Sequence, residues 1–546
     1  MIKARRLLVG LICCLSALAL FACNRIISRP SDSPVVVFDS PSEVIEGGQR
    51  LDTPDQDWDG FGEAVDVQDN LLVVGASEWN YYGAGSVYVY RLSGGEWQQE
   101  AQLAASDWKA FREQAGKSES QLFGDSVAVA GDSIAIGAPG NPGAISAGYS
   151  GAVYLFEYDG QTWKETAKLT PNHVHPDSTP IPVDQLSPDR IRRGTFGASI
   201  ALDGDTLAIA GDAVSDDVYI YQHAENGWQE QVRIPIPRSL GKDLYITSMA
   251  LSGDSLALST LSVPPQSDQI EKTGLMTGNV TIHVFSRVGD DWQENFQFIP
   301  ERGDMDFVFL ADANIGASVA MEGAPDRAEL LAVGLPGFPD WSSAEDLRLN
   351  YGVNPDLEMP AWPVSQWKAG AIYIFERSQN GGWNLQVTLR PAGWQNPPGA
   401  PSFLSRVPST PVDGQANSIA TPACIGLIDC RAATLEAQQE DFDREAFLAS
   451  FVSPGSFYSE DPEVSFFGAR VDLYGNQLAA TAGYANATYV FERRGQEWVY
   501  KVSISPGRVV AGVWEDFGQT VAISGHSLLL GTPGEFGDSA YVFDLP

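Results

Sequence analysis

Residues 123–169 read FGDSVAVAGDSIAIGAPGNPGAISAGYSGAVYLFEYDGQTWKETAKL, and this stretch holds the pattern that decides the fold. A Phe-Gly pair leads into a run of small and β-branched residues, a Gly-Asp turn and a second run that ends in Gly-Ala-Pro. A third run carries Tyr and Phe, and a fourth run opens with Trp163 after the Asp159-Gly160 turn. Short alternating runs separated by tight turn signals predict four antiparallel strands.

The same phrase returns seven times along the chain. Five clear copies open with Phe-Gly and begin at Phe61, Phe123, Phe196, Phe467 and Phe517. Ile315-Gly316 opens a variant copy, and a seventh copy near Thr247 has lost both letters but keeps the turn and the following strand. Repeats of this period are units that cannot bury their apolar faces alone, so they stack into an array.

The last copy lacks its fourth strand, because the chain ends soon after Phe543. Residues 48–52 precede the first Phe-Gly pair as residues 101–104 precede the second. We therefore expect the segment 44–52 to supply the missing outer strand, which would close the ring and protect its edges. The predicted fold is all-β: a seven-bladed β-propeller of four-stranded antiparallel blades over residues 44–546, with the last blade closed by an N-terminal strand.

A tryptophan stands at the same phase of six copies, where the fourth strand begins. These residues are Trp97, Trp163, Trp228, Trp292, Trp383 and Trp498. A large aromatic residue that recurs at one position of every unit is expected in the core rather than in a ligand site.

These repeats resemble FG-GAP repeats, the units of the integrin α-subunit propeller and of many bacterial surface proteins. The resemblance covers residues 44–546 and implies a propeller that binds partners on one of its faces. It also implies Ca²⁺ loops with the pattern Asp-x-Asp-x-Asp-Gly between the first and second strands. This chain has tight turns there, such as Gly131-Asp132, and a turn of that length cannot supply six or more oxygen ligands.

One acidic segment elsewhere has the spacing of a calcium loop. Asp55, Asp57, Asp59 and Glu63 occupy positions 1, 3, 5 and 9 of such a loop, and Gly60 occupies position 6. Calcium is therefore the one cofactor that the sequence suggests. The alternative is a solvated acidic linker, since the following Phe-Gly pair belongs to the first repeat.

The N-terminus has the features of a targeting segment. Residues 1–22 carry a positive start and an apolar run at residues 7–19, as a signal peptide does. The run ends in Leu-Phe-Ala-Cys, which resembles a bacterial lipobox and implies a lipid on the sulfur of Cys23. We therefore expect a lipid-anchored protein of the cell envelope, periplasmic or at the cell surface, in which residues 23–43 form the lipidated N-terminus and a linker. The alternative is an ordinary signal peptide cut nearby.

Charge and cysteine content limit the partners. The formal net charge is −36, and removing the three positive residues of the signal peptide makes it −39. A chain this acidic repels nucleic acids and anionic lipid headgroups. We therefore expect that it has no nucleic-acid partner and that it contacts the bilayer only through the acyl anchor. Cys424 and Cys430 are the two cysteines after Cys23. A secreted route makes a disulfide between them plausible, and it would close only one short loop.

All long insertions fall between strands 2 and 3 of a repeat or between strand 4 and the next repeat. In a propeller these connections share one face, and variable loops on a fixed scaffold usually bind. The longest insertions are residues 337–369 and 391–466. The first carries aromatic residues among acids: Trp341, Tyr351, Trp362 and Trp367. Such side chains stack on sugars or anchor a protein partner, unless they form a small core of the loop itself.

We find no nucleophile elbow, phosphate loop or dinucleotide fingerprint in the sequence. The leading interpretation is a non-catalytic binding module whose ligand is an envelope or extracellular protein or a glycan. One alternative is a hydrolase or lyase that acts on a polysaccharide at the same face, which would need convergent acids or histidines on loops 170–195 and 337–369. Another is a purely structural component of the envelope.

Overall fold

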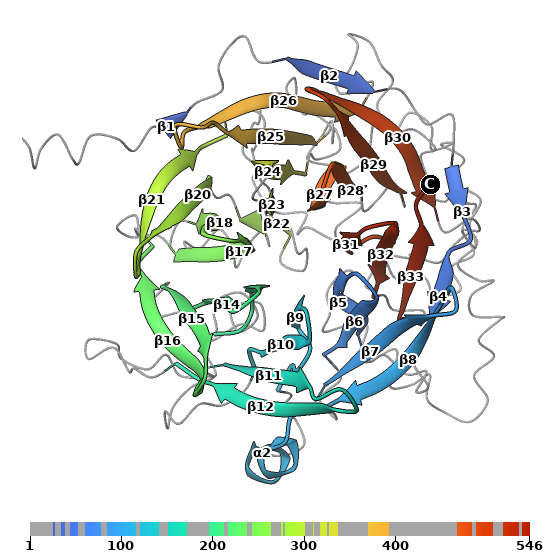
Figure 1. Ribbon diagram of the computed structural model, residues 1–546, viewed down its shortest axis with the longest axis vertical. Helices are drawn as coiled ribbons and strands as arrows, with labels where there is room; N and C mark the ends of the chain where they lie inside the picture. Colours follow the sequence, from blue (N-terminus) through green and yellow to red (C-terminus); the bar gives the residue numbers. More distant parts are fainter. Residues whose placement is uncertain are drawn as a thin grey trace, which may run out of the picture.

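The computed structural model describes residues 26–27, 34–38, 44–52, 60–77, 85–115, 121–140, 151–171, 196–211, 217–236, 243–263, 275–276, 279–300, 309–310, 317–324, 327–336, 370–391, 467–482, 487–505, 517–533 and 538–546. Their strands form seven sheets that radiate from a central opening (Figure 1). A separate pair joins β19 (Leu275–Met276) to β22 (Phe309–Leu310).

In blades 1 to 6 four strands run antiparallel in chain order from the centre to the rim. Blade 1 consists of β5 (Phe61–Gln68), β6 (Leu71–Ala76), β7 (Ser86–Ser93) and β8 (Glu96–Leu103). Blade 2 consists of β9 (Ser126–Ala130), β10 (Ser133–Ala138), β11 (Ala152–Tyr158) and β12 (Trp163–Leu169). Blade 3 consists of β13 (Ile200–Asp203), β14 (Thr206–Ala210), β15 (Val218–Ala224) and β16 (Gly227–Ile234).

The remaining blades repeat this order. Blade 4 consists of β17 (Asp243–Ser252), β18 (Ser255–Val263), β20 (Asn279–Val288) and β21 (Asp291–Phe298). Blade 5 consists of β23 (Ser318–Ala324), β24 (Arg327–Leu335), β25 (Ala371–Arg377) and β26 (Trp383–Pro391). Blade 6 consists of β27 (Phe467–Tyr474), β28 (Gln477–Ala482), β29 (Ala487–Arg494) and β30 (Glu497–Ser505). Blade 7 begins with β31 (Thr520–Ser524), β32 (Ser527–Thr532) and β33 (Ser539–Asp544).

An N-terminal strand completes blade 7. β4 (Gln49–Leu51) pairs antiparallel with β33, with Leu51 opposite Ala540, and Leu51 is buried in the core between blades 7 and 1. Gly48 leads into β4 so close to β33 that a Cβ there would lie 2.5 Å from the carbonyl oxygen of Val542. The predicted closure by an N-terminal strand is therefore confirmed, but only residues 49–51 of the predicted segment 44–52 form the strand, and residues 44–46 pair with blade 6 instead. The chain is a seven-bladed β-propeller.

Three further strands extend the rim in a way that the sequence did not predict. β1 (Ile26–Ile27), β2 (Val35–Phe38) and β3 (Val44–Glu46) pair parallel with the outer strands β21, β26 and β30. We call these three strands the N-terminal belt. The belt lies outside blades 4, 5 and 6 in turn (Figure 1). Strands β1 and β2 lie within residues 23–43, which the sequence suggested as a linker.

The Phe of the repeat packs within its own blade. In five blades its ring meets a Tyr of the third strand edge to face, at centroid distances of 5.2–5.8 Å; the pairs are Phe61–Tyr88, Phe123–Tyr154, Phe196–Tyr219, Phe467–Tyr489 and Phe517–Tyr541. Edge-to-face packing of this kind adds about 1 kcal/mol per pair beyond the area that it buries.

The two glycines of the repeat meet between blades. The Gly after Phe has φ between +77° and +99° in these five copies, a backbone conformation that favours glycine. Its carbonyl faces the glycine of the Gly-Ala-Pro position in the preceding blade. A Cβ at that second glycine would lie 1.9–2.3 Å from this oxygen for the pairs Gly75–Gly124, Gly137–Gly197, Gly334–Gly468 and Gly531–Gly62. The repeated letters therefore encode close contact between neighbouring blades.

The apolar core is divided among the blade interfaces. Among the residues that the structure describes, seven clusters of buried side chains occur, and each joins two adjacent blades, including the pair formed by blades 7 and 1. Of the repeated tryptophans, Trp97, Trp292, Trp383 and Trp498 are buried, while Trp163 and Trp228 are half-buried against a cluster. Their predicted structural role is confirmed.

Among the described residues one α-helix occurs, α2 (Trp108–Ala115), and it lies outside blade 2 (Figure 1). This helix is too short to cross a bilayer. In the described part of the chain, no helix is both long enough and apolar enough to do so.

Candidate functional site

The two faces of the ring differ in the connections that they carry. The turn face holds the turns between strands 1 and 2 and between strands 3 and 4, such as Gly131-Asp132 and Gly289-Asp290. The loop face holds the other connections, including the intervals from β8 to β9, β12 to β13, β24 to β25 and β26 to β27. The described strand ends that flank the insertions noted in the sequence therefore lie on the loop face.

Most of the residues suggested as sites lie outside the described part of the chain. These are Cys23, Asp55, Asp57, Asp59, Trp341, Tyr351, Trp362, Trp367, Cys424 and Cys430. Their assignments to lipidation, calcium, ligand and disulfide stay predictions.

Glu63 is the one described member of the suggested calcium set. It lies on β5, and its carboxylate accepts a hydrogen bond from the hydroxyl of Ser77. The backbone N–H of Gly60 donates to Asp538 at 2.8 Å, so a carboxylate of blade 7 approaches the same segment. Within the described residues, no group of three or more His, Cys, Asp or Glu side chains is arranged to hold a metal ion.

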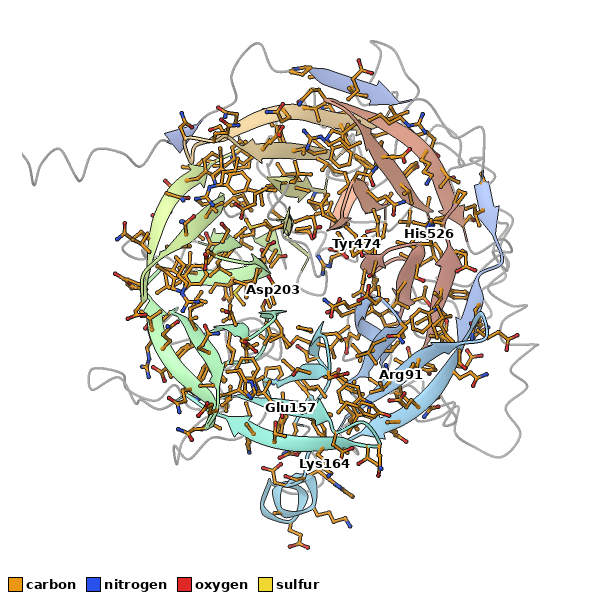
Figure 2. The ribbon with its side chains drawn as sticks, viewed as in Figure 1. Arg91, Glu157, Lys164, Asp203, Tyr474 and His526 are labelled. Atoms are coloured by element: carbon orange, nitrogen blue, oxygen red, sulfur yellow. The ribbon has the colours of Figure 1, made fainter. Side chains whose placement is uncertain are left out.

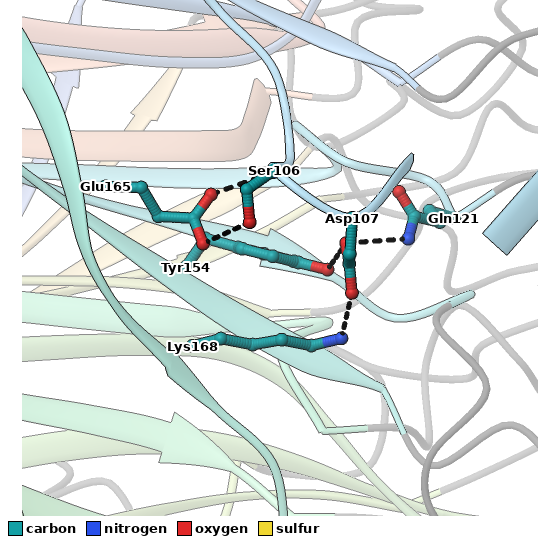
Figure 3. Close-up of polar contacts among 6 residues, drawn as sticks. All are labelled: Ser106, Asp107, Gln121, Tyr154, Glu165 and Lys168. Carbon is teal, nitrogen blue, oxygen red and sulfur yellow. Dashed lines mark hydrogen bonds and ion pairs between the residues drawn. The ribbon is translucent and has the colours of Figure 1, made fainter. Parts of the chain in front are cut away.

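On the loop face, a polar cluster joins the connection after blade 1 to the outer strands of blade 2 (Figure 3). Asp107 accepts hydrogen bonds from Tyr154 at 2.7 Å, Lys168 at 2.6 Å and Gln121 at 3.3 Å. Next to it, the backbone N–H and hydroxyl of Ser106 donate to Glu165 at 2.9 and 2.8 Å.

Burial raises the pKa of Asp107, but the hydrogen bonds from Lys168 and Tyr154 outweigh it and hold that pKa below its usual value. The carboxylate is therefore ionised at neutral pH and bonded on both oxygens. A base already saturated in this way is poorly suited to proton transfer. We assign the cluster a structural role: it fixes the start of α2 against the loop face of blade 2.

The turn face carries contacts that hold neighbouring blades together. In four successive interfaces, a side chain at the end of the third strand of a blade contacts a polar side chain of the preceding blade. The pairs are His223–Glu157 at 3.2 Å, Arg287–Gln222 at 3.2 Å, Arg377–Ser286 at 3.1 Å and Arg493–Glu376 at 2.9 Å. Much of the polar surface on this face therefore already serves the ring.

Two aspartates on the innermost strands connect adjacent blades near the central opening. Asp66 on β5 accepts the N–H of Val67 at 2.8 Å and that of Val129, in blade 2, at 2.7 Å. Asp472 on β27 accepts the N–H of Leu473 and that of Ile523, in blade 7, both at 2.8 Å. Each carboxylate thus satisfies backbone donors on the edge of an innermost strand. Figure 2 shows Asp203, which ends the innermost strand of blade 3, and Tyr474, which ends the strand that carries Asp472, beside the same opening.

Burial within the ring gives these carboxyl groups unusual pKa values. It raises the pKa of Asp66 to about 6, against the opposing effect of the two backbone hydrogen bonds. Burial likewise raises the pKa of Asp472 to about 7, and the negative charges of Asp66 and Glu322 add to the increase. Both side chains are half-buried by exposed area but surrounded by the protein atoms of the ring, which solvate their charge poorly.

Stability should consequently fall as pH rises through 6 to 7. A native pKa above the unfolded value of 3.8 means that the native state binds more protons between these values, so the stabilisation is complete below pH 3.8 and is lost through the folded pKa. We expect urea unfolding to give a loss of at least about 2 kcal/mol between pH 5 and 8.

The double variant Asp66→Asn/Asp472→Asn should lose most of this slope. The exposed turn-face variant Asp254→Asn is the control and should keep it. An equal slope in the double variant would mean that other groups carry the pH dependence.

One buried set has the order of a catalytic triad. Thr260, His283 and Glu294 lie on adjacent strands of blade 4. The hydroxyl oxygen of Thr260 lies 3.2 Å from Nε2 of His283, whose Nδ1 lies 2.7 Å from Glu294. Thr260 is 2% exposed and His283 5%, so no substrate reaches the hydroxyl.

His283 stands just before the strand bulge of β20, at a position where other blades carry Tyr. Blade 4 also lacks the Phe-Gly pair. Blade 4 therefore has a hydrogen-bonded imidazole at the position where other blades pair a Tyr with the Phe of the repeat.

No protein-family model matches the sequence, and no curated protein matches it. Solved structures give weak superpositions. A chain in the crystal structure of a mitotic checkpoint complex has TM-score 0.41 at 11% identity, over 94% of this chain and 99% of that one. A putative 6-phosphogluconolactonase from Bacteroides uniformis gives 0.36 at 10%, over 81% and 83%. The periplasmic gluconolactonase PpgL of Pseudomonas aeruginosa gives 0.35 at 12%, over 82% and 86%. At such scores we draw nothing from them, and the fold rests on the strand pairing.

Sequence reasoning missed Asp66 and Asp472, although a signal was present. Both occupy a position of the first strand where other copies carry Ala, for example Ala128 and Ala201. Aligning the copies would have marked an aspartate in this crowded position as unusual. Asp107 gave no comparable signal, because it lies in a connection that is not repeated.

Proposed function

We propose that this protein is a lipid-anchored binding module of the cell envelope, which holds a protein or glycan ligand on its loop face without chemical conversion. The observation that carries the proposal is the asymmetry of the two faces. Long connections leave and re-enter the ring on the loop face, whereas the turn face has tight turns and the series of contacts between blades. A rigid ring that presents variable loops on one side is suited to recognition.

A non-catalytic role is supported by the polar groups that the structure describes. The Asp107 cluster is bonded on both carboxylate oxygens, and the one hydroxyl–imidazole–carboxylate series is buried. The aspartates of the central opening are engaged with backbone N–H groups. In the described residues, each of these groups therefore has a structural task.

Binding to an array of bacterial and host polysaccharides tests the proposal, together with capture of proteins from a soluble envelope extract. If the ligand is a glycan, Trp362→Ala/Trp367→Ala should weaken binding at least about tenfold, because stacking contributes roughly 1–3 kcal/mol per aromatic residue at a hot spot. The matched control is Tyr474→Ala, which removes an exposed aromatic side chain from the turn face.

Glycan binding that falls with Tyr474→Ala and not with the tryptophan pair would place the site on the wrong face for this proposal. If the purified protein cleaved a polysaccharide of the array into smaller products, the protein would be an enzyme and the proposed non-catalytic role would be wrong.

A further inference from the structure

We propose that the N-terminal belt is a detachable strap, whose strands β1, β2 and β3 leave the rim while β4 stays in place and keeps the ring closed. The inference comes from the unequal ways in which the belt and β4 are attached to the blades.

β4 is fixed to two blades at once. In blade 7 it pairs with β33, and Gly48 brings the two strands close together. Toward blade 1, the side-chain amide of Gln49 donates to the carbonyl oxygen of Trp97 at 2.7 Å, and its carbonyl oxygen accepts the N–H of Trp97 at 2.9 Å. Leu51 is buried in the core that these two blades share. Release of β4 therefore breaks contacts in blades 7 and 1 together.

The belt strands have much smaller attachments. β1, β2 and β3 pair over two, four and three residues, and each pairs with the outer strand of a single blade. Of their described side chains, Val36 and Ile45 are half-buried against core clusters, whereas Val35 and Val44 are 36% and 46% exposed. All three strands lie on the outside of the ring (Figure 1). Because elements with few buried contacts open locally at low cost, the belt opens more readily than β4.

A glycine stands between the belt and β4 as a hinge. Gly47 has φ +76°, and a Cβ at this residue would meet nothing within 4 Å. It lies where the chain passes from parallel pairing with blade 6 to antiparallel pairing with blade 7. Glycine adopts many backbone conformations, so the chain can change direction here without moving β4.

Release of the strap lengthens the connection to the ring. Residues 26–46 are then unpaired, and a segment of roughly 20 residues reaches about 70 Å when it is extended. If the chain is lipid-anchored as proposed, the released strap allows the ring to move farther from the membrane and the loop face to reach a more distant ligand. This consequence rests on the proposed anchor, whereas the strap itself does not.

Hydrogen exchange resolved to single residues tests the strap on the purified protein. The protected amides of β2 and β3 should exchange at least about 100-fold faster than those of β4, because only β4 requires two blades to open. The amide of Thr388 reports from the ring, since it donates to the carbonyl oxygen of Pro34 at 3.0 Å, and it should exchange together with β2. Exchange of β2 and β3 no faster than that of β4, or at the rate of an unstructured peptide, would overturn the proposal.

Two variants distinguish release of the belt from general loosening of the ring. Val44→Cys/Ser503→Cys, in the chain with Cys424→Ser and Cys430→Ser, should join β3 to β30 by a disulfide, because these residues are partners on neighbouring strands. When oxidised, it should slow exchange in β3 at least about tenfold and leave β4 unchanged, and reduction should restore the original rate. Gly47→Ala should instead speed up exchange in β3 about fivefold, because alanine disfavours a positive φ. If neither variant changed exchange in β3, that exchange would not report release of a strap and the proposal would fail.

A separate measurement distinguishes the strap from the lipid anchor. Mass spectrometry of the N-terminal peptide shows whether Cys23 carries acyl chains, and their absence would refute the anchor without affecting the strap. Equal exchange in β2, β3 and β4 would refute the strap whatever the state of Cys23.

Discussion

Replacing Gly137 with alanine should destabilise the propeller by about 3 kcal/mol or more, although the change adds a single methyl group. The new Cβ would lie 2.0 Å from the carbonyl oxygen of Gly197 in the next blade and 2.2 Å from the hydroxyl of Ser126. The first contact is with backbone, which cannot move aside without separating blades 2 and 3. Chemical unfolding followed by tryptophan fluorescence measures the loss.

Gly131→Ala is the matched control within the same blade. Gly131 has φ +58° and a Cβ there would meet nothing within 4 Å, so alanine would add backbone strain without a clash. That strain costs about 1 kcal/mol. If both variants lost the same stability, the contact between the repeat glycines would not be what holds these blades together.

Removing the closure strand should have the second large effect. A chain of residues 53–546 lacks β4, so blade 7 would have three strands and β33 would present an open edge. It also lacks Leu51, which is 4% exposed in the core between blades 7 and 1. Losing this side chain and the strand pairing should cost about 5 kcal/mol in total. Thermal unfolding and size-exclusion chromatography would report an opened, aggregation-prone ring.

The shorter truncation 44–546 is the control, because it removes β1 and β2 but keeps β3 and β4. It should retain most of the stability of the intact chain. Adding a peptide of residues 44–52 to the longer truncation should restore part of the lost stability. Failure of the peptide to bind, together with full stability of residues 53–546, would contradict closure by β4.

The repeat made the fold predictable because its letters correspond to contacts that recur. Phe123 meets Tyr154 within a blade, and Gly137 meets Gly197 between blades, so each copy carried the same information. One exception follows the same logic. Blade 4 lacks the Phe-Gly pair, and the preceding blade correspondingly has Ala210 in place of the second glycine. Between blades 6 and 7 the pairing is not kept, because Thr481 stands at the second position although Gly518 remains.

Features that occur once could not be read from the pattern. The belt strands are two to four residues long and pair with distant outer strands, so they carry no periodic signal of their own. Asp107 acts through Tyr154 and Lys168, which a local reading does not bring together. The loops suggested to bind ligand have no repeated partner, and their chemistry depends on contacts that sequence spacing does not define.

The most direct test of the proposed function is to block one face at a time. In the chain with Cys424→Ser and Cys430→Ser, a bulky polymer is attached to Ile299→Cys on the loop face or to Asp254→Cys on the turn face; both residues are exposed and belong to blade 4 or its flanking loop. Capture of the polysaccharide or envelope protein found by screening is then measured. We predict that the polymer at position 299 abolishes capture and that the polymer at position 254 leaves it intact. Loss of capture only with the polymer at position 254 would contradict binding on the loop face.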